Sequence, residues 1–409
     1  MTLDDAAAEH SALARAHLLD QIDAAGGWLA FERFMDLALY APALGYYSGG
    51  AQKLGADGDF TTAPEVSRLF GACVAVQCAE ILSELRSGRV LEIGAGSGRL
   101  AADILARLES QGRLPERYSI LEISADLRER QRAYLEQRLP HLLARVHWLD
   151  RPPEQPFEGV ILANEVLDAL PVARFRWRES AVDEPGAVDE SGAVDESGAV
   201  DELGMVDELG VAISGGQFIW AARPANEAMT RTCRELSERS DRWDDGYVSE
   251  YCPRMGAWVQ SVTQSLARGA VLWIDYGLPR AQYYLPERRD GTLVCHYRHR
   301  MSSDPFVHVG LQDITAWVDF TRVAEASRDA GLDVAGFTTQ AHFLAGLGID
   351  LEMQLAARGD ENLFARLGRE ARQLLLPGEM GERFKVMACL RAMDMPLSGF
   401  KILDLRHTL

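Results

Sequence analysis

The residues with the clearest chemical potential lie in the nonapeptide VLEIGAGSG at positions 90–98. A short run suited to a buried strand leads directly into three glycines, Gly94, Gly96 and Gly98. Glycine allows a sharp turn and lets the backbone approach a ligand closely. A dinucleotide fingerprint also needs glycine at its sixth position, which is Arg99 here. Glu92 adds a carboxylate that suits an ammonium or a sulfonium better than a pyrophosphate. The pattern therefore favours S-adenosylmethionine (SAM) over a nicotinamide cofactor.

A second segment, ANEVLDALPVARF, covers residues 163–175 and follows an apolar run that predicts a strand. Methyl transfer from a sulfonium is an in-line displacement, so the protein mainly has to position the acceptor. Asn164 suits a neutral amide acceptor. A guanidinium stays charged at ordinary pH and calls for a carboxylate pair such as Glu165 and Asp168. The two acids lie at a predicted strand-to-helix transition and are expected to face one cleft. Alternatively, Asp168 caps a helix beginning near Ala169 or supports the turn at Pro171, and Glu165 acts alone.

Acidic residues also follow the other predicted strands. In parallel α/β sheets, ligands bind beyond the carboxyl ends of the strands. Glu122 ends the second strand, where a carboxylate can accept both hydroxyls of a ribose. Asp150 ends the third strand, where it can accept from an adenine amino group, and Asp275 with Tyr276 ends the fifth. Any one of these acids could simply be a solvated residue at a strand end. Because polar residues end several successive strands, the sequence predicts one cofactor site that also includes Asn164.

A third segment, GYYSGGAQKLGADGDFTTAPEVSRLF, covers residues 45–70. Thr62, Pro64 and Glu65 resemble a helix start with proline in its first turn. Glycines, an aromatic residue and acids that include Asp59 precede this start. An ordinary helix entry does not require such a run. The segment therefore predicts a loop that folds over a bound ligand.

Short apolar runs that alternate with helical stretches predict the elements that must position these residues. Seven runs are read as strands, at 89–94, 118–124, 144–150, 159–165, 270–277, 333–340 and 383–391. Helices are expected between the first three strands, at 99–110 and 126–138. This alternation predicts an α/β fold with a doubly wound, mainly parallel seven-stranded sheet whose last strand is antiparallel. Such a sheet is typical of a Rossmann-like class I methyltransferase.

The rest of the chain is predicted to build around this sheet. We expect a helical N-terminal region with the cofactor-covering loop (1–80), the first half of the SAM-binding domain (81–171), an insertion (172–268) and the second half (269–409). The N-terminal region and the insertion are expected to form a lid or second lobe. Within the insertion, a hexapeptide such as VDESGA occurs five times over 182–211, with ten acids and no base. It predicts a disordered, solvated extension of a hairpin, with an acidic arm for a basic partner as the alternative.

The composition excludes some classes of function. The formal net charge of −19 argues against broad nucleic-acid binding through phosphates and is compatible with a basic protein substrate. No window approaches the about 20 apolar residues of a membrane span. Six scattered cysteines lack metal-ligand spacing, so no metal site is expected. Reduced thiols and an N-terminus without a signal or transit peptide predict a cytoplasmic location.

Several motifs together resemble the MidA family of SAM-dependent methyltransferases. They follow the family order: FMDLALYAPALGYYS (34–48), GDFTTAPEVSRLFG (58–71), VLEIGAGSG (90–98), NEVLDALP (164–171), IDYG (274–277), DITAWVDF (313–320), TTQAHFL (338–344) and GERFKVMA (381–388). The resemblance implies a class I fold with SAM as the methyl donor. Mitochondrial members of the family symmetrically dimethylate an arginine on a subunit of respiratory complex I and support its assembly.

Specific roles also follow from this resemblance. The three glycines of VLEIGAGSG would line the SAM turn, and Glu122 would bind the ribose. Glu165 would lie next to the methyl acceptor, and the GDFTTAPE loop would cover cofactor and substrate. The leading interpretation is a SAM-dependent protein methyltransferase that acts on an arginine of a respiratory-chain subunit. The alternatives are a small-molecule N- or O-methyltransferase, since the fold hosts many acceptors, and a non-catalytic SAM-binding assembly factor. The sequence leaves the oligomeric state open.

Overall fold

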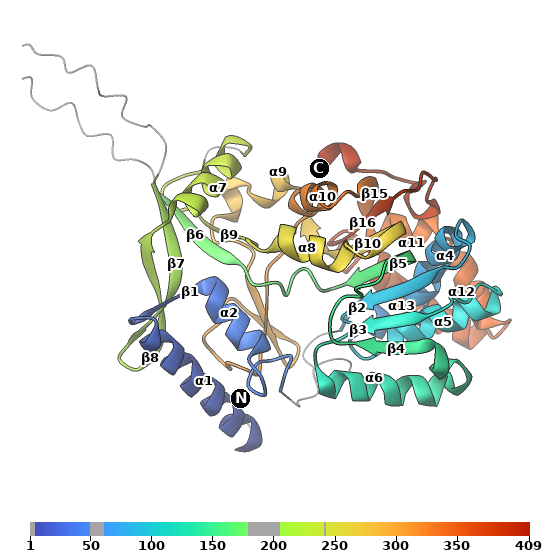
Figure 1. Ribbon diagram of the computed structural model, residues 1–409, viewed down its shortest axis with the longest axis horizontal. Helices are drawn as coiled ribbons and strands as arrows, with labels where there is room; N and C mark the ends of the chain where they lie inside the picture. The colour runs from blue at the N-terminus through green and yellow to red at the C-terminus, as the bar shows by residue number, and fades with distance from the viewer. Residues whose placement is uncertain (1–4, 50–60, 179–204, 241–242) are drawn as a thin grey trace, which may run out of the picture.

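The computed structural model describes residues 5–49, 61–178, 205–240 and 243–409. Its central feature is a mainly parallel sheet in the order β4-β3-β2-β5-β10-β16-β15 (Figure 1). Only β16 is antiparallel to its neighbours on this path, β10 and β15. These strands are β2 (Arg89–Ile93), β3 (Tyr118–Leu121), β4 (Val146–Leu149), β5 (Phe157–Asn164), β10 (Leu266–Leu278), β15 (Asp333–Thr339) and β16 (Phe384–Arg391). The short strand β14 (Val318–Asp319) pairs in parallel with the C-terminal end of β10. The predicted α/β fold is confirmed.

Helices cover both faces of this sheet because its strands are apolar on both sides, as is typical of a buried parallel sheet. Val90 packs into a core on one face, and its neighbour Leu91 packs into a separate core on the other. The first face is covered by α4 (Arg68–Ser83), α5 (Arg99–Ser110), α6 (Ala125–Arg138), α11 (Gln340–Gly346), α12 (Ile349–Ala357) and α13 (Glu361–Leu375). The second face is covered by α8 (Met255–Thr263) and α10 (Phe320–Asp329).

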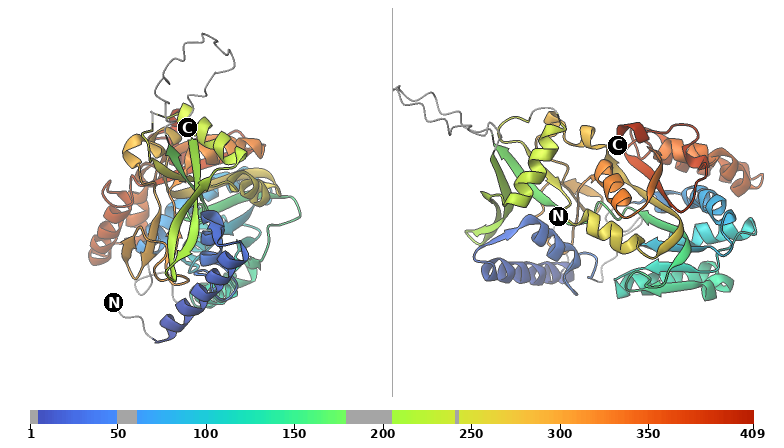
Figure 2. Two further views of the ribbon diagram at one scale, coloured as in Figure 1. Left: turned by 90° about the vertical axis from the view of Figure 1, so that its left-hand side faces the viewer. Right: turned by 45° about the horizontal axis from the view of Figure 1, so that its top comes forward.

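A second lobe lies at the other end of the long axis (Figures 1 and 2). Its sheet has the order β1-β7-β6-β9, with β8 also paired to β7. The strands are β1 (Trp28–Ala30), β6 (Ala173–Arg178), β7 (Met205–Ser214), β8 (Gln217–Pro224) and β9 (Val248–Tyr251). Three helices accompany them, α1 (Asp5–Ala24), α2 (Phe31–Tyr40) and α7 (Glu227–Glu238). Residues 5–40 and the described parts of 173–251 therefore build this lobe together.

The acidic repeat departs from its prediction at its C-terminal end. Strands β6 and β7 pair antiparallel with Arg178 opposite Met205, so the repeat does connect two strands. Its last hexapeptide, 206–211, is however part of β7 and not a disordered extension. Val206, Leu209 and Val211 are buried there, and Asp207 pairs with arginines of β6. Apolar residues and paired charge thus make this copy a strand, while 182–204 lies outside the described residues.

A small third sheet connects the lobes beside the carboxyl edge of the central sheet. It contains β12 (Arg300–Ser302), β11 (Val294–Tyr297) and β13 (Asp313–Thr315) in that order. The residue after β13, Ala316, donates its amide to the carbonyl of Asp168 at 3.0 Å. The described helices include none that is both long and apolar enough to span a bilayer.

Candidate functional site

The glycine-rich turn joins β2 to α5 with an unusual backbone. Gly94, Gly96 and Gly98 have φ values of 65°, 54° and 85°, the left-handed region that favours glycine. Gly98 is the N-cap of α5, and a Cβ added there would lie 3.3 Å from the Cα of Gln131. The turn therefore needs glycine for its conformation, as the sequence predicts.

A cleft of about 480 Å³ opens over this turn at the carboxyl ends of β2, β3 and β5. Its floor comes from the central sheet and includes Glu92, Gly94, Gly96, Glu122, Asn164 and Glu165. Its opposite wall comes from the N-terminal region and includes Asp36, Tyr40, Tyr47, Thr62, Pro64 and Glu65. Residues predicted from four separate sequence segments thus lie around one cavity of a size that holds a small ligand.

Glu122 follows β3 and is held by hydrogen bonds on both carboxylate oxygens. The Ser124 amide donates to Oε1 at 2.9 Å, and Gln131 Nε2 donates to Oε2 at 3.1 Å. Gln131 also donates to the carbonyl of Gly96 at 3.0 Å and accepts from Trp148 Nε1 at 2.9 Å. Gln131 therefore ties the acidic residue to the glycine turn. Sequence reasoning missed it, although Gln131 lies between Leu127 and Leu135 on the buried stripe of α6.

The cofactor end of the cleft fits the parts of SAM. The carboxylate of Glu122 can accept ribose hydroxyls. Ile123 is 63% exposed and lines the cleft with Leu127, so apolar surface is available to an adenine ring. Glu92 is buried, accepts from the Tyr118 hydroxyl at 2.7 Å and has a pKa raised to about 7 by burial. A cationic ligand would stabilise its ionised form.

The short helix α3 (Ala63–Val66) borders the cleft next to the glycine turn. Thr62 is its N-cap and Pro64 lies in its first turn, as predicted. Glu65 forms an ion pair of 2.8 Å with Arg99 and accepts from the Ser97 hydroxyl. These contacts fix α3 against the turn. Asp59, also predicted to contact the cofactor, lies outside the described residues.

Glu165 lines the cleft directly after β5 in a constrained conformation. Its φ is 54°, a left-handed value that is uncommon for a residue with a side chain and is often associated with functional sites. The Ala63 amide and Asn164 Nδ2 donate to its Oε1 at 3.3 and 3.1 Å. The backbone after it is held by Asp275, whose Oδ2 accepts from the amides of residues 166–168. Asp275 thus positions Glu165.

Burial raises the pKa of Glu165, Asp168 and Asp275, and nearby acids add to this for Glu165 and Asp275. Burial and then Asp168 raise the pKa of Glu165 to about 8. Burial raises the pKa of Asp168 to about 6, and burial followed by Asp168 and Glu165 raises that of Asp275. The main groups acting on Glu165, in the described part of the chain, include no cation. This end of the cleft is therefore suited to a positively charged acceptor.

Three predicted site residues are placed differently from expectation. Asp168 is buried and does not line the cleft, because residues 165–170 form a turn held by Asp275 and not the start of a helix. The helix cap predicted as its alternative role is absent for the same reason. Asp150 is exposed after the edge strand β4 and does not line the cleft either. Gly98 supports the turn from beneath the cleft wall and is not part of its lining.

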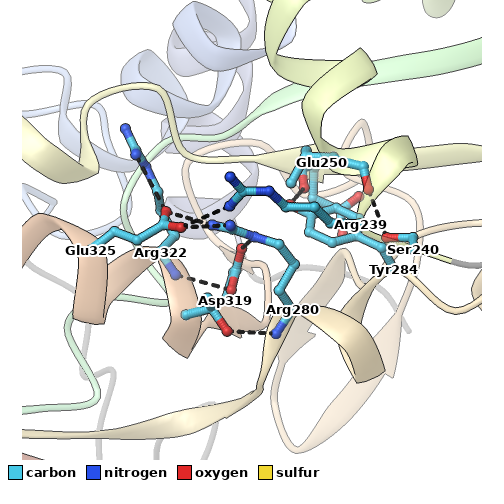
Figure 3. A network of polar contacts seen from close by, with 10 residues as sticks. Arg239, Ser240, Glu250, Arg280, Tyr284, Asp319, Arg322 and Glu325 are labelled. Carbon is cyan, nitrogen blue, oxygen red and sulfur yellow. Dashed lines mark hydrogen bonds and ion pairs between the residues drawn. The ribbon is translucent and has the colours of Figure 1, made fainter. Parts of the chain in front are cut away.

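A second cavity of about 430 Å³ lies beyond the turn that follows Glu165. Its most buried charge is Arg280 of α9 (Arg280–Tyr283), which pairs bidentately with Glu325 at 2.7 Å and with Asp319 at 3.2 Å (Figure 3). Arg239 and Arg322 approach the same Glu325. Three arginines thus share two carboxylates, and we interpret this network as a joint between α7, α9 and α10.

The fold and the cleft together define a class I SAM-dependent methyltransferase. Residues 73–338 match the family described as S-adenosyl-L-methionine-dependent methyltransferases, and the chain belongs to this family. The crystal structure of a Burkholderia thailandensis protein bound to S-adenosyl-homocysteine (SAH) is 40% identical, with a TM-score of 0.89 over 100% of both chains. The predicted resemblance, enzyme class and cofactor are confirmed.

Curated relatives are also similar over most of the chain. One from Danio rerio is 28% identical over 95% of this chain and 92% of its own length, and one from Bos taurus is 30% identical over 91% and 82%. Both are named protein arginine methyltransferase NDUFAF7, mitochondrial. The predicted cytoplasmic location is overturned by these names, since both relatives are named as mitochondrial proteins.

Proposed function

We propose that this enzyme methylates an arginine side chain of a protein, and that the protein is a subunit of the respiratory chain. The observation that carries the proposal is Glu165, a partly buried carboxylate on the cleft floor surrounded by further acids. Burial and the neighbouring acids disfavour its ionised form. A guanidinium would pair with it through charge-assisted hydrogen bonds.

The relatives named protein arginine methyltransferases support the choice of arginine and of a protein as substrate. The respiratory-chain subunit is supported by the motifs shared with the MidA family. The alternatives, a small-molecule acceptor or a scaffold that binds SAM without transfer, have no specific contact in the cleft that favours them.

SAM supplies an electrophilic methyl group on its sulfonium sulfur. For the new N–C bond to form as the S–C bond breaks, one guanidinium nitrogen must regain its lone pair and lose a proton. Glu165 is placed to hold the guanidinium and to accept that proton, and a pKa above the usual carboxylate range suits a general base. Asn164 and the Ala63 amide hold its carboxylate in place. The charge of Asp168 raises the proton affinity of Glu165 further.

The test begins with titration of the full-length protein with SAM and SAH. Radiolabelled methyl transfer from SAM is then measured in a lysate from cells that lack the gene, and the modified residue is identified by mass spectrometry. We expect a labelled protein that carries methylarginine. Glu165→Gln should retain SAH binding and lose at least about 100-fold in turnover.

Glu154→Gln is the matched control, because Glu154 is 71% exposed in its ion pair with Arg151, and it should leave turnover unchanged. Label on small molecules alone would support the metabolite methyltransferase. SAH binding without label in any component would support the scaffold. If Glu165→Gln lost SAH binding by as large a factor as turnover, Glu165 would have no separate role in the chemistry.

A further inference from the structure

Two tyrosines of the N-terminal region form an aromatic wall at the acceptor end of the cleft. Tyr40 ends α2 and Tyr47 follows in the next turn, and both line the cleft with Glu165. Their rings are stacked, with centroids 5.4 Å apart and planes inclined by 18°. Both belong to FMDLALYAPALGYYS, a motif to which neither the cofactor site nor the chemistry assigns a role.

Hydrogen bonds fix the two rings in place. The Tyr40 hydroxyl donates to the Ala169 carbonyl at 2.9 Å, and the Tyr47 hydroxyl donates to both oxygens of Asp313 at 3.1 and 3.0 Å. The Tyr47 amide donates to the Leu39 carbonyl at 2.8 Å. The wall is therefore preorganised, which reduces the ordering that a bound group would have to impose.

The turn that carries Tyr47 leaves no room for a side chain at Gly45. A Cβ there would lie 2.6 Å from backbone atoms of Leu39 and Ala41. The Gly45 amide donates to the Ala41 carbonyl at 2.7 Å and closes the turn. The glycine-tyrosine-tyrosine order of the motif thus has a physical reason, because the tight turn brings Tyr47 back against Tyr40.

The surroundings of the wall attract a cation. Asp168 and Asp313 act electrostatically on both phenols and also on Glu165. One cation, Arg254, also lines the cleft and acts on Tyr40, but its guanidinium is already paired with Glu32 and Asp36. Burial, followed by the charge of Asp313, raises the pKa of both tyrosines well above the usual value, so the rings stay neutral. A neutral aromatic face beside carboxylates favours a planar cation, and a guanidinium stacks on such a face better than an ammonium does.

We propose that the Tyr40–Tyr47 pair is the specificity wall of the acceptor site, against which the target guanidinium stacks while Glu165 holds its edge. This inference rests on the proposed arginine methylation. Asp313 is a positioning residue for Tyr47, since it does not line the cleft. The adenine end of the cleft, at Ile123 and Leu127, is formed by separate elements, so the wall is not needed to hold the cofactor.

The experiment measures binding of three probe peptides to the full-length protein saturated with SAH. The probes are acetyl-Gly-Gly-Xaa-Gly-Gly-amide with arginine, citrulline or lysine at the central position. Citrulline keeps the plane without the charge, and lysine keeps the charge without the plane. We expect the arginine peptide to bind at least tenfold more tightly than either of the others.

Two pairs of variants then separate the rings from the hydroxyls. Tyr40→Leu and Tyr47→Leu remove a ring and should weaken the arginine peptide about 3- to 30-fold. Tyr40→Phe and Tyr47→Phe keep the ring and should bind it within about threefold of the wild type. SAH affinity, measured in the same titrations, should be unchanged in all four variants and shows that each one is folded.

Each contrary result has a distinct meaning. If the leucine variants bind the arginine peptide as the wild type does, the wall does not contact the guanidinium, while the proposed function stands. If they weaken the arginine and citrulline peptides equally, the wall is only an apolar surface and the inference is overturned. If the wild type does not prefer arginine over citrulline, the proposed arginine methylation fails and the inference fails with it.

Discussion

The carboxamide of Gln131 joins the two halves of the cofactor site, since its Nε2 donates to both Glu122 Oε2 and the carbonyl of Gly96. Gln131 is fully buried, and its Oε1 is occupied by Trp148. A single side chain therefore orients the Glu122 carboxylate, which we propose binds the ribose, relative to the glycine turn. Such outer contacts hold binding groups in the geometry that a ligand needs.

Gln131→Leu is expected to weaken SAH binding by about 10-fold or more, because Glu122 loses its donor and a buried polar contact is left unmade. Isothermal titration with SAH gives the change, and a thermal melt without ligand reports any loss of stability. Gln137→Leu, at an exposed position of the same helix, is the control and should bind SAH normally. Equal affinities in the two variants would show that Gln131 does not orient Glu122.

Gly96→Val is expected to abolish SAH binding. Gly96 has a φ of 54° and lines the cleft, so a branched side chain there strains the backbone and occupies cofactor space. Gly112→Val is the matched control, because Gly112 has a φ of 65°, lies outside the cleft and has no atom within 4 Å of the position that a Cβ would take. It should lose stability, by about 1–2 kcal/mol, but retain SAH affinity. Retained SAH binding in Gly96→Val would contradict this assignment.

The sequence predicted the central sheet well because its strands have a strong local signal. Each is a short apolar run bounded by polar residues, and burial on both faces requires that pattern. The residues at the strand ends, such as Glu122 and Glu165, could be placed for the same reason. Parallel strands bring their carboxyl ends to one edge of the sheet.

Contacts between segments far apart in the chain had no such signal. Asp275 fixes the 166–168 turn from 107 residues away, and this tertiary contact replaces the helix predicted after Glu165. Tyr40 and Tyr47 reach the proposed acceptor site through the packing of α2 within the second lobe, which periodicity in α2 alone does not reveal. The sequence predicted Asp168 and Asp150 in the cleft, and neither lines it. The direction of a side chain at a strand end cannot be inferred from the spacing of residues.

The stability of the ligand-free protein is expected to fall as the pH rises from about 5.5 to 8.5. Burial raises the pKa of Glu165 to about 8, of Glu92 and Asp103 to about 7, and of Asp168 to about 6. Across this range the folded state binds more protons than the unfolded state, so the free energy of unfolding decreases with pH. Thermal melts at a series of pH values measure the slope.

Glu165→Gln removes one of these titrating groups and should flatten that slope, with its largest gain over the wild type above pH 8. Glu154→Gln, at an exposed site, should follow the wild-type curve. Superimposable pH profiles for the wild type and Glu165→Gln would show that Glu165 titrates normally in the folded protein.

Arg280→Ala is expected to destabilise the protein by about 3–5 kcal/mol, because it removes the guanidinium paired with Asp319 and leaves Glu325 with only its longer pairs to Arg239 and Arg322. The Arg280 side chain is only 9% exposed and binds Glu325 through both terminal nitrogens. Arg151→Ala breaks a 3.4 Å pair whose partners are 76% and 71% exposed, and should cost less than about 1 kcal/mol. Urea unfolding of both variants gives the comparison. SAH affinity should be unchanged in Arg280→Ala below the unfolding range, since the network lines the second cavity and not the cleft. A loss of SAH affinity in the folded variant would instead couple the two cavities through the turn that follows Glu165.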